Sequence, residues 1–266
     1  MSSINTVFIS HGGGPLPVLG DPGHTEMVSA LKQLADELPR PKAILVISAH
    51  WEASRPTVTS ASKPGMMYDY GGFPDEAYQL QYPSPGEPVL AEKIASALQS
   101  AGIHAESSPD RPYDHGLYIP LMLMYPEADI PAIQLSLVKG LDPDEHLRIG
   151  EALQGLDYDD LLIIGSGFSF HNMRAFFIPE SNDMHAANAA FQGWLEETCM
   201  STTLTEDDRR QRLQHWAEAP SARYCHPREE HLLPLHVCYG IAGRPADEHI
   251  ATKILGKASG MYAWTA

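Results

Sequence analysis

The residues of this chain best suited to chemistry are histidines that stand where apolar segments end. Short apolar segments immediately precede His11 and His50, and a third leads through a turn rich in glycine and serine to His171. Each segment is typical of a buried strand, and parallel strands deliver the residues that follow them to one edge of a sheet. One such histidine alone would equally suit a hydrogen-bonded residue at the rim. Its threefold recurrence favours a single metal-binding or acid–base centre.

Two further histidines each follow a carboxylate where a helix is expected to begin. Asp114 precedes His115 at the entrance to an apolar helix, and Glu230 precedes His231 in the first turn of the last strong helix. His115, placed in this way, suits proton transfer, although a capping Asp114 beside an incidental His115 would give the same pattern. His231 and His236 are about 500° apart around a helix, so this segment offers one metal ligand rather than two.

The cysteines do not indicate a thiolate centre. Cys199, Cys225 and Cys238 are odd in number, far apart and without a C-x-x-C pair, so neither a disulfide framework nor a cysteine metal site is indicated. With 13 histidines in the chain, a metal site should be bound by nitrogen and oxygen, which suits Fe(II), Mn(II) or Zn(II).

Composition and charge narrow the class of protein. The 266 residues are 43% hydrophobic and 20% charged, which fits one soluble domain over residues 1–266. The formal charge of -16 argues against a nucleic-acid or anionic-membrane partner, because either surface would repel the chain. No apolar segment approaches the length of a membrane span and no signal peptide is evident, so we expect a cytoplasmic protein.

The elements that must position these histidines alternate between strands and helices. This order predicts an α/β domain with a central, mostly parallel or mixed sheet flanked by helices and a metal site at the carboxyl-terminal edge of its strands. Besides the three strands above, we expect a strand at residues 130–137, edge strands within residues 250–264, and helices at residues 25–38, 85–101, 142–156, 184–198 and 229–241. The loop of residues 66–74, rich in aromatic side chains, is expected to form a pocket wall, and His24 to lie in a solvated loop.

The chain resembles the class III, LigB-like extradiol ring-cleavage dioxygenases, most closely the branch that includes the 4,5-DOPA extradiol dioxygenases. The resemblance rests on an ordered set of motifs from residue 6 to about 240, none of which is specific alone. They are Ser10-His11-Gly12, Ser48-Ala49-His50-Trp51, Gly71-Gly72-Phe73-Pro74, Tyr82-Pro83-Ser84-Pro85-Gly86, Asp114-His115-Gly116, residues 125–131, Gln134-Leu135-Ser136, His171-Asn172 and Glu230-His231-Leu232-Leu233-Pro234-Leu235.

The resemblance implies a single α/β catalytic domain with one metal ion at the sheet edge. His11, His50 and His231 match metal-binding positions of the family, and Glu230 is the alternative third ligand. His171 matches a position that is a further zinc ligand in some relatives and an acid–base histidine in others. His115 matches a catalytic histidine outside the metal ligands, with Asp114 beside it in the sequence.

The implied activity is O2-dependent cleavage of a catecholic ring, DOPA-like or related, at a mononuclear non-haem metal. Fe(II) would serve activity, and Zn(II) would readily occupy the same site in purified protein because its affinity for such ligands is higher. The chain departs from its close relatives after His11, where Gly-Gly-Gly-Pro-Leu-Pro replaces the more usual Gly-Ser-Pro. That loop would help to shape the substrate pocket, so the resemblance does not specify which catechol is cut.

Two other functions fit the same residues. A zinc hydrolase could use the cluster to activate water, with Glu230 or Asp114 as the base, although no H-E-x-x-H motif is present. His171 as a fourth ligand would make the tetrahedral site typical of zinc. A LigB-like interaction protein that has lost catalysis is the third possibility, against which the complete set of histidines argues.

Overall fold

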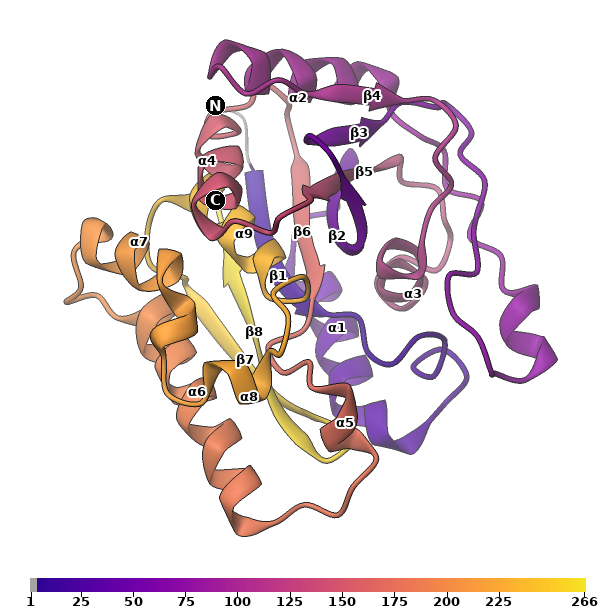
Figure 1. The fold of residues 1–266 in the computed structure, drawn as a ribbon. Helices are drawn as coiled ribbons and strands as arrows, with labels where there is room; N and C mark the ends of the chain where they lie inside the picture. The colour runs from indigo at the N-terminus through magenta and orange to yellow at the C-terminus, as the bar shows by residue number, and fades with distance from the viewer. Residues whose placement is uncertain (1–3) are drawn as a thin grey trace.

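One eight-stranded sheet organises the computed structural model, which describes residues 4–266 (Figure 1). The strands are β1 (Ile4–Ser10), β2 (Ala43–Ala53), β3 (Thr57–Thr59), β4 (Glu106–Ser108), β5 (Ala132–Val138), β6 (Leu161–Gly167), β7 (Glu248–Ile254) and β8 (Lys257–Trp264). Their order across the sheet is β4-β3-β5-β2-β6-β1-β8-β7. The central strands β5, β2, β6 and β1 are mutually parallel, whereas β3 on β5, β8 on β1 and β7 on β8 pair antiparallel. The expected α/β class with a mixed sheet is therefore confirmed.

Helices cover both faces of this sheet. They are α1 (Thr25–Glu37), α2 (Pro88–Ser100), α3 (His115–Met124), α4 (Pro143–Ala152), α5 (Met173–Phe176), α6 (Asn182–Met200), α7 (Glu206–Gln214), α8 (Ala222–Cys225) and α9 (Leu233–Ala242), with the short 3-10 helices η1 (Pro22–His24), η2 (Asp75–Gln79) and η3 (Trp216–Glu218). One core cluster includes side chains of α1 and α3, and the second includes side chains of α2 and α4. Within the described part of the chain, no helix combines the length and the apolar character that a bilayer crossing needs.

Strand β2 lies at the centre of the sheet because its apolar side chains serve both cores. Ile44 and Val46 belong to the cluster with α1 and α3, while Leu45 and Ile47 belong to the cluster with α2 and α4, and all four are fully buried. Side chains on a strand alternate between the two faces, so an unbroken apolar segment is what a doubly covered strand requires. The sequence-based prediction of a strand buried on both faces is confirmed.

The carboxyl-terminal end of β2 differs from the expectation. The strand continues through His50 to Ala53, but its pairing with β5 shifts, since Ser48 lies opposite Ser136 and Glu52 lies opposite Leu137. The intervening residues of β2 thus have no counterpart on β5. Such irregularities change the direction of side chains at sheet edges and beside active sites. Here the irregularity leaves His50 outside the regular pairing of β2 with β5.

The carboxyl-terminal third of the chain brings two further corrections. Helix α9 begins at Leu233 rather than near residue 229, because Pro234 favours the first turn of a helix, and Glu230 and His231 consequently lie in the turn before it. Of the two strands expected at an edge, only β7 lies there, whereas β8 is enclosed between β1 and β7.

Helix α9 carries a buried histidine that makes stability depend on pH. His236 is fully buried, with Nε2 2.9 Å from the backbone oxygen of Leu213 and Nδ1 3.3 Å from that of Leu232. Burial lowers the pKa of His236 to about 4, although contacts with these carbonyl groups act in the opposite direction. In the unfolded chain the pKa of histidine is about 6.5, so on acidification the unfolded chain takes up the proton first.

We therefore expect the free energy of unfolding to fall as the pH drops from 6.5 towards 4, with His236 accounting for about 2 kcal/mol of the loss at pH 5. Urea unfolding of wild type and His236→Gln at pH 7.5 and pH 5 measures this share, and substitution of the exposed His104 is the control. The variant should lose less stability than wild type between the two pH values. If both proteins lost the same free energy of unfolding between the two pH values, burial would not lower the pKa of His236, which would contradict this prediction.

Candidate metal centre

Three imidazoles from separate elements converge at the carboxyl-terminal edge of the parallel strands. His11 follows β1, His50 lies in the irregular end of β2, and His231 lies in the turn before α9. The Nε2 atom of His50 is 3.0 Å from that of His11 and 3.3 Å from that of His231. The ligand atoms of all three lie within 4.8 Å of one another. The structure thus brings together the three histidines that the family resemblance proposed as metal ligands, whereas the recurrence of strand ends had grouped His171 with His11 and His50.

A serine in the central strand β6 fixes the orientation of His11. The Ser166 hydroxyl donates to the backbone oxygen of Gly116 over 2.5 Å, and His11 Nδ1 lies 3.0 Å from the same hydroxyl oxygen. Because the hydroxyl hydrogen is already committed, the hydrogen-bond network assigns the proton to Nδ1 of His11. The lone pair on Nε2 is therefore directed into the cluster.

His231 is anchored through both its backbone and its ring. Its carbonyl oxygen accepts a hydrogen bond of 2.9 Å from the N–H of Phe168, and its Nδ1 lies 3.0 Å from Oε1 of Glu230. A Cβ atom on Gly167 would come within 2.1 Å of that carbonyl oxygen, so only glycine lets this turn approach the end of β6. The glycine-rich turn that sets His171 apart in the sequence thus makes room for His231.

The protonation state of the cluster suits a divalent cation. Burial, followed by repulsion from neighbouring histidines, holds the pKa values of His11 and His50 well below their ordinary range. The same two effects lower the pKa of His231 to about 3. The three rings are therefore neutral, and the Nε2 lone pairs that they direct at one another could bind a metal ion. Nitrogen ligands of this kind fit Fe(II), Mn(II) or Zn(II), and three ligands leave coordination positions open.

His171 and Glu230 lie beside this set of three. The ring of His171 stacks on that of His231 with centroids 3.4 Å apart, and its Nδ1 lies 3.3 Å from Oε1 of Glu230. Among residues 4–266, the ligand atoms of His171, Glu230 and His231 form a second close group, which includes neither His11 nor His50. Burial raises the pKa of Glu230, but the hydrogen bonds to His171 and His231 outweigh it and keep the carboxylate ionised. Glu230 therefore lies behind His231, on the Nδ1 side of its ring.

His115 begins α3 and lies against the other side of the cluster. Its ring centroid is 3.8 Å from that of His50, and both its backbone N and its Nδ1 lie within 3.0 Å of Asp69 Oδ1. Burial raises the pKa of Asp69, but the contacts with His115 lower it by more. The net effect lowers the pKa, so this carboxylate stays ionised. Asp69 belongs to the loop of residues 66–74, where the sequence indicated a pocket wall containing a carboxylate but gave it no contact with His115.

Asp114, the residue expected to act with His115, faces the sheet instead. Its carboxylate accepts a hydrogen bond of 2.7 Å from Ser48 and one of 3.2 Å from Arg111, and it is fully buried. Burial raises the pKa of Asp114, although the hydrogen bond from Ser48 opposes this. The expectation that Asp114 contacts the His115 ring is therefore corrected, because Asp69 makes that contact. Asp114 instead links the start of α3 to the end of β2 through Ser48.

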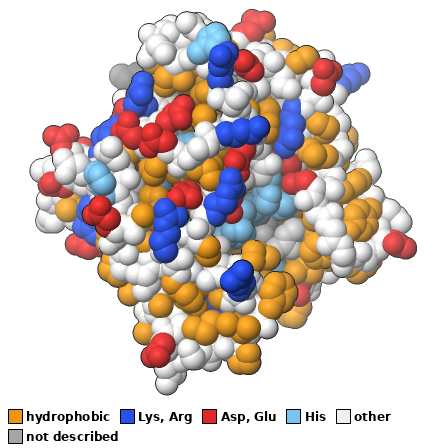
Figure 2. Space-filling view, viewed as in Figure 1, with side chains coloured by type: hydrophobic (Ala, Val, Ile, Leu, Met, Phe, Trp, Pro, Cys, Tyr) orange, Lys and Arg blue, Asp and Glu red, His pale blue; other side chains and the backbone are white. Residues whose placement is uncertain are grey.

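The centre is accessible from solvent. Figure 2 shows pale-blue histidine side chains in a recess near the middle of the face, with charged side chains beside them. The side chains of His50 and His171 are 23% and 19% exposed. The ring of Tyr70, from the loop of residues 66–74, lies 5.7 Å from that of His115. Aromatic side chains of this loop thus stand next to the cluster.

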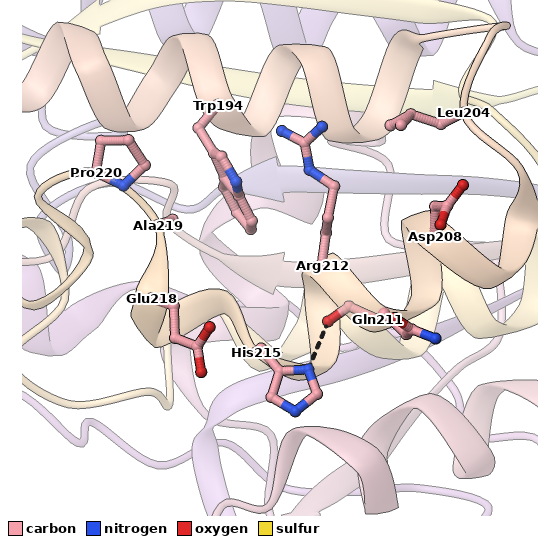
Figure 3. A pocket seen from close by; sticks show the side chains of 9 residues that line it. All are labelled: Trp194, Leu204, Asp208, Gln211, Arg212, His215, Glu218, Ala219 and Pro220. Atoms are coloured by element: carbon pink, nitrogen blue, oxygen red, sulfur yellow. Dashed lines mark hydrogen bonds between the residues drawn. The ribbon is translucent and has the colours of Figure 1, made fainter.

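A hollow of about 480 Å³ lies elsewhere, between α6, α7 and η3 (Figure 3). Trp194 lines it from α6, and Arg212 and His215 line it from α7 and the residue after it. None of the clustered histidines lines this hollow. We therefore assign the chemistry to the histidine cluster and not to the hollow.

Comparison with known proteins agrees with this geometry. A sequence profile of the family described as "Catalytic LigB subunit of aromatic ring-opening dioxygenase" matches residues 6–264. "Dioxygenase tasH" from Hapsidospora irregularis is 40% identical over 250 residues, which cover 89% of this chain and 77% of the relative. "4,5-DOPA dioxygenase extradiol" from Beta vulgaris is 40% identical over 241 residues, which cover 90% and 87%. The crystal structure of an uncharacterized protein from Escherichia coli K12 matches with a TM-score of 0.76 at 25% identity, over 97% of this chain and 98% of that chain.

The contact between Ser166 and His11 generates a prediction about metal affinity. Ser166→Ala removes the acceptor that fixes the His11 ring, and loss of such supporting contacts typically weakens metal binding about 10- to 100-fold. Ser84→Ala, which removes another buried hydroxyl that donates to a backbone oxygen, is the matched control. Titration with Co(II) against a competing chelator should show weaker binding only for Ser166→Ala. Equal affinities in the two variants would contradict the assigned support.

Proposed function

Because the chain belongs to the LigB family of aromatic ring-opening dioxygenases, we propose that it is an extradiol dioxygenase that cleaves a catecholic ring with O2 at one non-haem metal ion. His11, His50 and His231 would hold the ion. The observation that carries this proposal is the convergence of their Nε2 atoms. The Nε2 atom of His50 lies 3.0 Å from that of His11 and 3.3 Å from that of His231. The family supports the reaction class, and this convergence supports the choice of His11, His50 and His231 as ligands.

Fe(II) is the metal that we propose for activity, with Zn(II) able to occupy the same ligands in purified protein. When bound, the ion would supply Lewis acidity towards the catechol hydroxyls and redox chemistry towards O2. The chain's own contribution is to hold three neutral imidazoles in place while leaving the recess open to substrate. Ser166 and Glu230 do this for His11 and His231, each by occupying Nδ1.

We assign the proton transfers to His115 and His171. Asp69 occupies the Nδ1 side of His115, which leaves Nε2 as the nitrogen able to exchange a proton with a bound substrate. Glu230 occupies the Nδ1 side of His171 in the same way. The two rings flank the cluster, next to His50 and His231 respectively. His171 or His115 would accept a catechol proton, and His115 would return a proton as the ring opens.

The wall beside His115 suits an aromatic substrate. The ring of Tyr70 packs edge-on against that of Phe73, with centroids 5.5 Å apart, and its centroid lies 5.7 Å from that of the His115 ring. Aromatic side chains favour stacked or edge-on contacts with another ring. Since several relatives are named as 4,5-DOPA dioxygenases, DOPA and related catechols are the first substrates to test.

The contacts of the carboxylates weigh against a zinc hydrolase. The two candidate bases for activating water were Glu230 and Asp114. Glu230 contacts the rings of His171 and His231, and Asp114 accepts hydrogen bonds from Ser48 and Arg111. Asp114 is thus tied to the end of β2 and Glu230 supports the His171 and His231 rings, so the dioxygenase is the function that we propose.

Turnover provides the direct test. Protein loaded anaerobically with Fe(II) should consume O2 and form a yellow ring-fission product with at least one member of a catechol panel that includes L-DOPA. Removal of the metal with a chelator should abolish both signals, and Fe(II) should restore them. Absence of O2 uptake across the whole panel, or ester hydrolysis by the Zn(II) form that is indifferent to O2, would refute the proposal.

Substitutions separate the ligands from the proton-transfer groups. His50→Ala should abolish metal binding and therefore activity. His115→Ala should retain the metal but lower turnover by about 10²–10⁴-fold, because it removes only a proton-transfer group. Asp69→Asn should lower turnover in the same direction, whereas metal content measured by atomic emission should stay at the wild-type level. Loss of metal from His115→Ala would contradict its assigned role.

A further inference from the structure

The loop that follows His11 is held in place by a histidine to which the proposed chemistry gives no role. This loop contains Gly12 and Gly14, whose φ angles of +80° and +57° lie in the left-handed region. A Cβ on Gly12 would come within 2.6 Å of Pro17 and 2.9 Å of His24, so the loop is packed tightly against both. The backbone of this loop therefore has little freedom to shift.

His24 uses both nitrogens of its ring. Its Nε2 accepts a hydrogen bond of 3.0 Å from the N–H of Gly13, and its Nδ1–H donates to Asp21 Oδ1 over 2.8 Å. The same Asp21 oxygen accepts a second hydrogen bond, of 2.9 Å, from the N–H of Gly23. Although the sequence suggested a solvated loop, His24 is fully buried, which corrects that expectation. A fully buried imidazole with both nitrogens engaged fixes the backbone on either side of it.

The glycine loop in turn touches the aromatic wall. A Cβ on Gly14 would lie 3.2 Å from the ring of Phe73 and 3.8 Å from Cβ of Tyr70. Tyr70 follows Asp69, which contacts His115. One continuous chain of contacts thus leads from His24 to the wall beside the cluster.

We propose that His24 is a positioning residue, which sets the loop of residues 12–14 against Tyr70 and Phe73 and thereby fixes the substrate-facing wall next to His115. This inference rests on the proposed function, since the wall faces a substrate only if an aromatic ring binds at the cluster. The ring of His11 is held separately by Ser166. His24 therefore acts on substrate binding and leaves metal affinity unchanged.

Two substitutions divide the hydrogen bonds of His24 between them. In His24→Gln the side-chain amide can place an acceptor near the position of Nε2, so the bond to Gly13 is kept. In His24→Asn the amide can replace Nδ1 and donate to Asp21, but the N–H of Gly13 loses its partner. A buried donor without a partner is costly, so His24→Asn should raise KM for the catechol about 10-fold with a smaller change in kcat, whereas His24→Gln should stay within about threefold of wild type.

Two measurements do not depend on turnover. Amide exchange of the peptide that covers residues 12–19 should be faster in His24→Asn than in wild type or His24→Gln. Co(II) affinity should be the same in all three proteins. Equal KM values for the Asn and Gln variants, or unchanged exchange in His24→Asn, would overturn the inference. A wild-type protein that turns over no catechol would instead refute the proposed function, and the exchange comparison would still decide the role of His24 in holding the loop.

Phe73→Ala tests the same coupling from the opposite end if His24→Asn does not fold. Removal of the Phe73 ring takes away the surface on which Gly14 rests. It should speed amide exchange in residues 12–19 and raise KM, with the metal affinity of wild type. Unchanged exchange in Phe73→Ala would show that the loop and the wall are independent, and would overturn the inference.

Discussion

The convergence of three buried, neutral imidazoles is the constraint on which the rest of this structure depends. The Nε2 atom of His50 lies 3.0 Å from that of His11 and 3.3 Å from that of His231, so the three rings converge on one point. It persists because the surrounding fold holds the rings of His11 and His231 from behind, through Ser166 on β6 and Glu230 in the turn before α9. A ligand that binds these rings only in the folded state also stabilises the fold.

The order of the strands explains how these anchors reach the same place. Strand β6 enters the sheet between β1 and β2, so the strand that supplies Ser166 separates the strands that supply His11 and His50. Its last residue, Gly167, has no side chain and lets the His231 turn close over the end of the sheet. The proposed ligands His11 and His50 therefore come from strand ends on either side of β6, at the carboxyl-terminal edge where open α/β sheets bind ligands, and His231 comes from a turn that rests on the end of β6.

The sequence predicted what depends on local periodicity and missed what depends on tertiary contact. The apolar segments before His11 and His50 indicated both the strands and the edge at which these residues lie. Residue type and position did not distinguish His171 from His231 as the third member, because that choice depends on how the turn before α9 docks; the family resemblance supplied it. Asp69 was missed as the partner of His115 because its loop has no periodicity, and the adjacent Asp114 was a nearer candidate in the chain. His24 was predicted to be solvated because the polar residues next to it in the sequence give no sign that its side chain is buried.

The origin of the three rings has a consequence for how the protein matures. His11 follows the first strand, His50 lies in the second, and His231 comes after six of the eight strands. A growing chain on the ribosome therefore lacks a complete chelating set until synthesis is almost finished. A metal ion held by all three rings could therefore not act as a template for the early stages of folding.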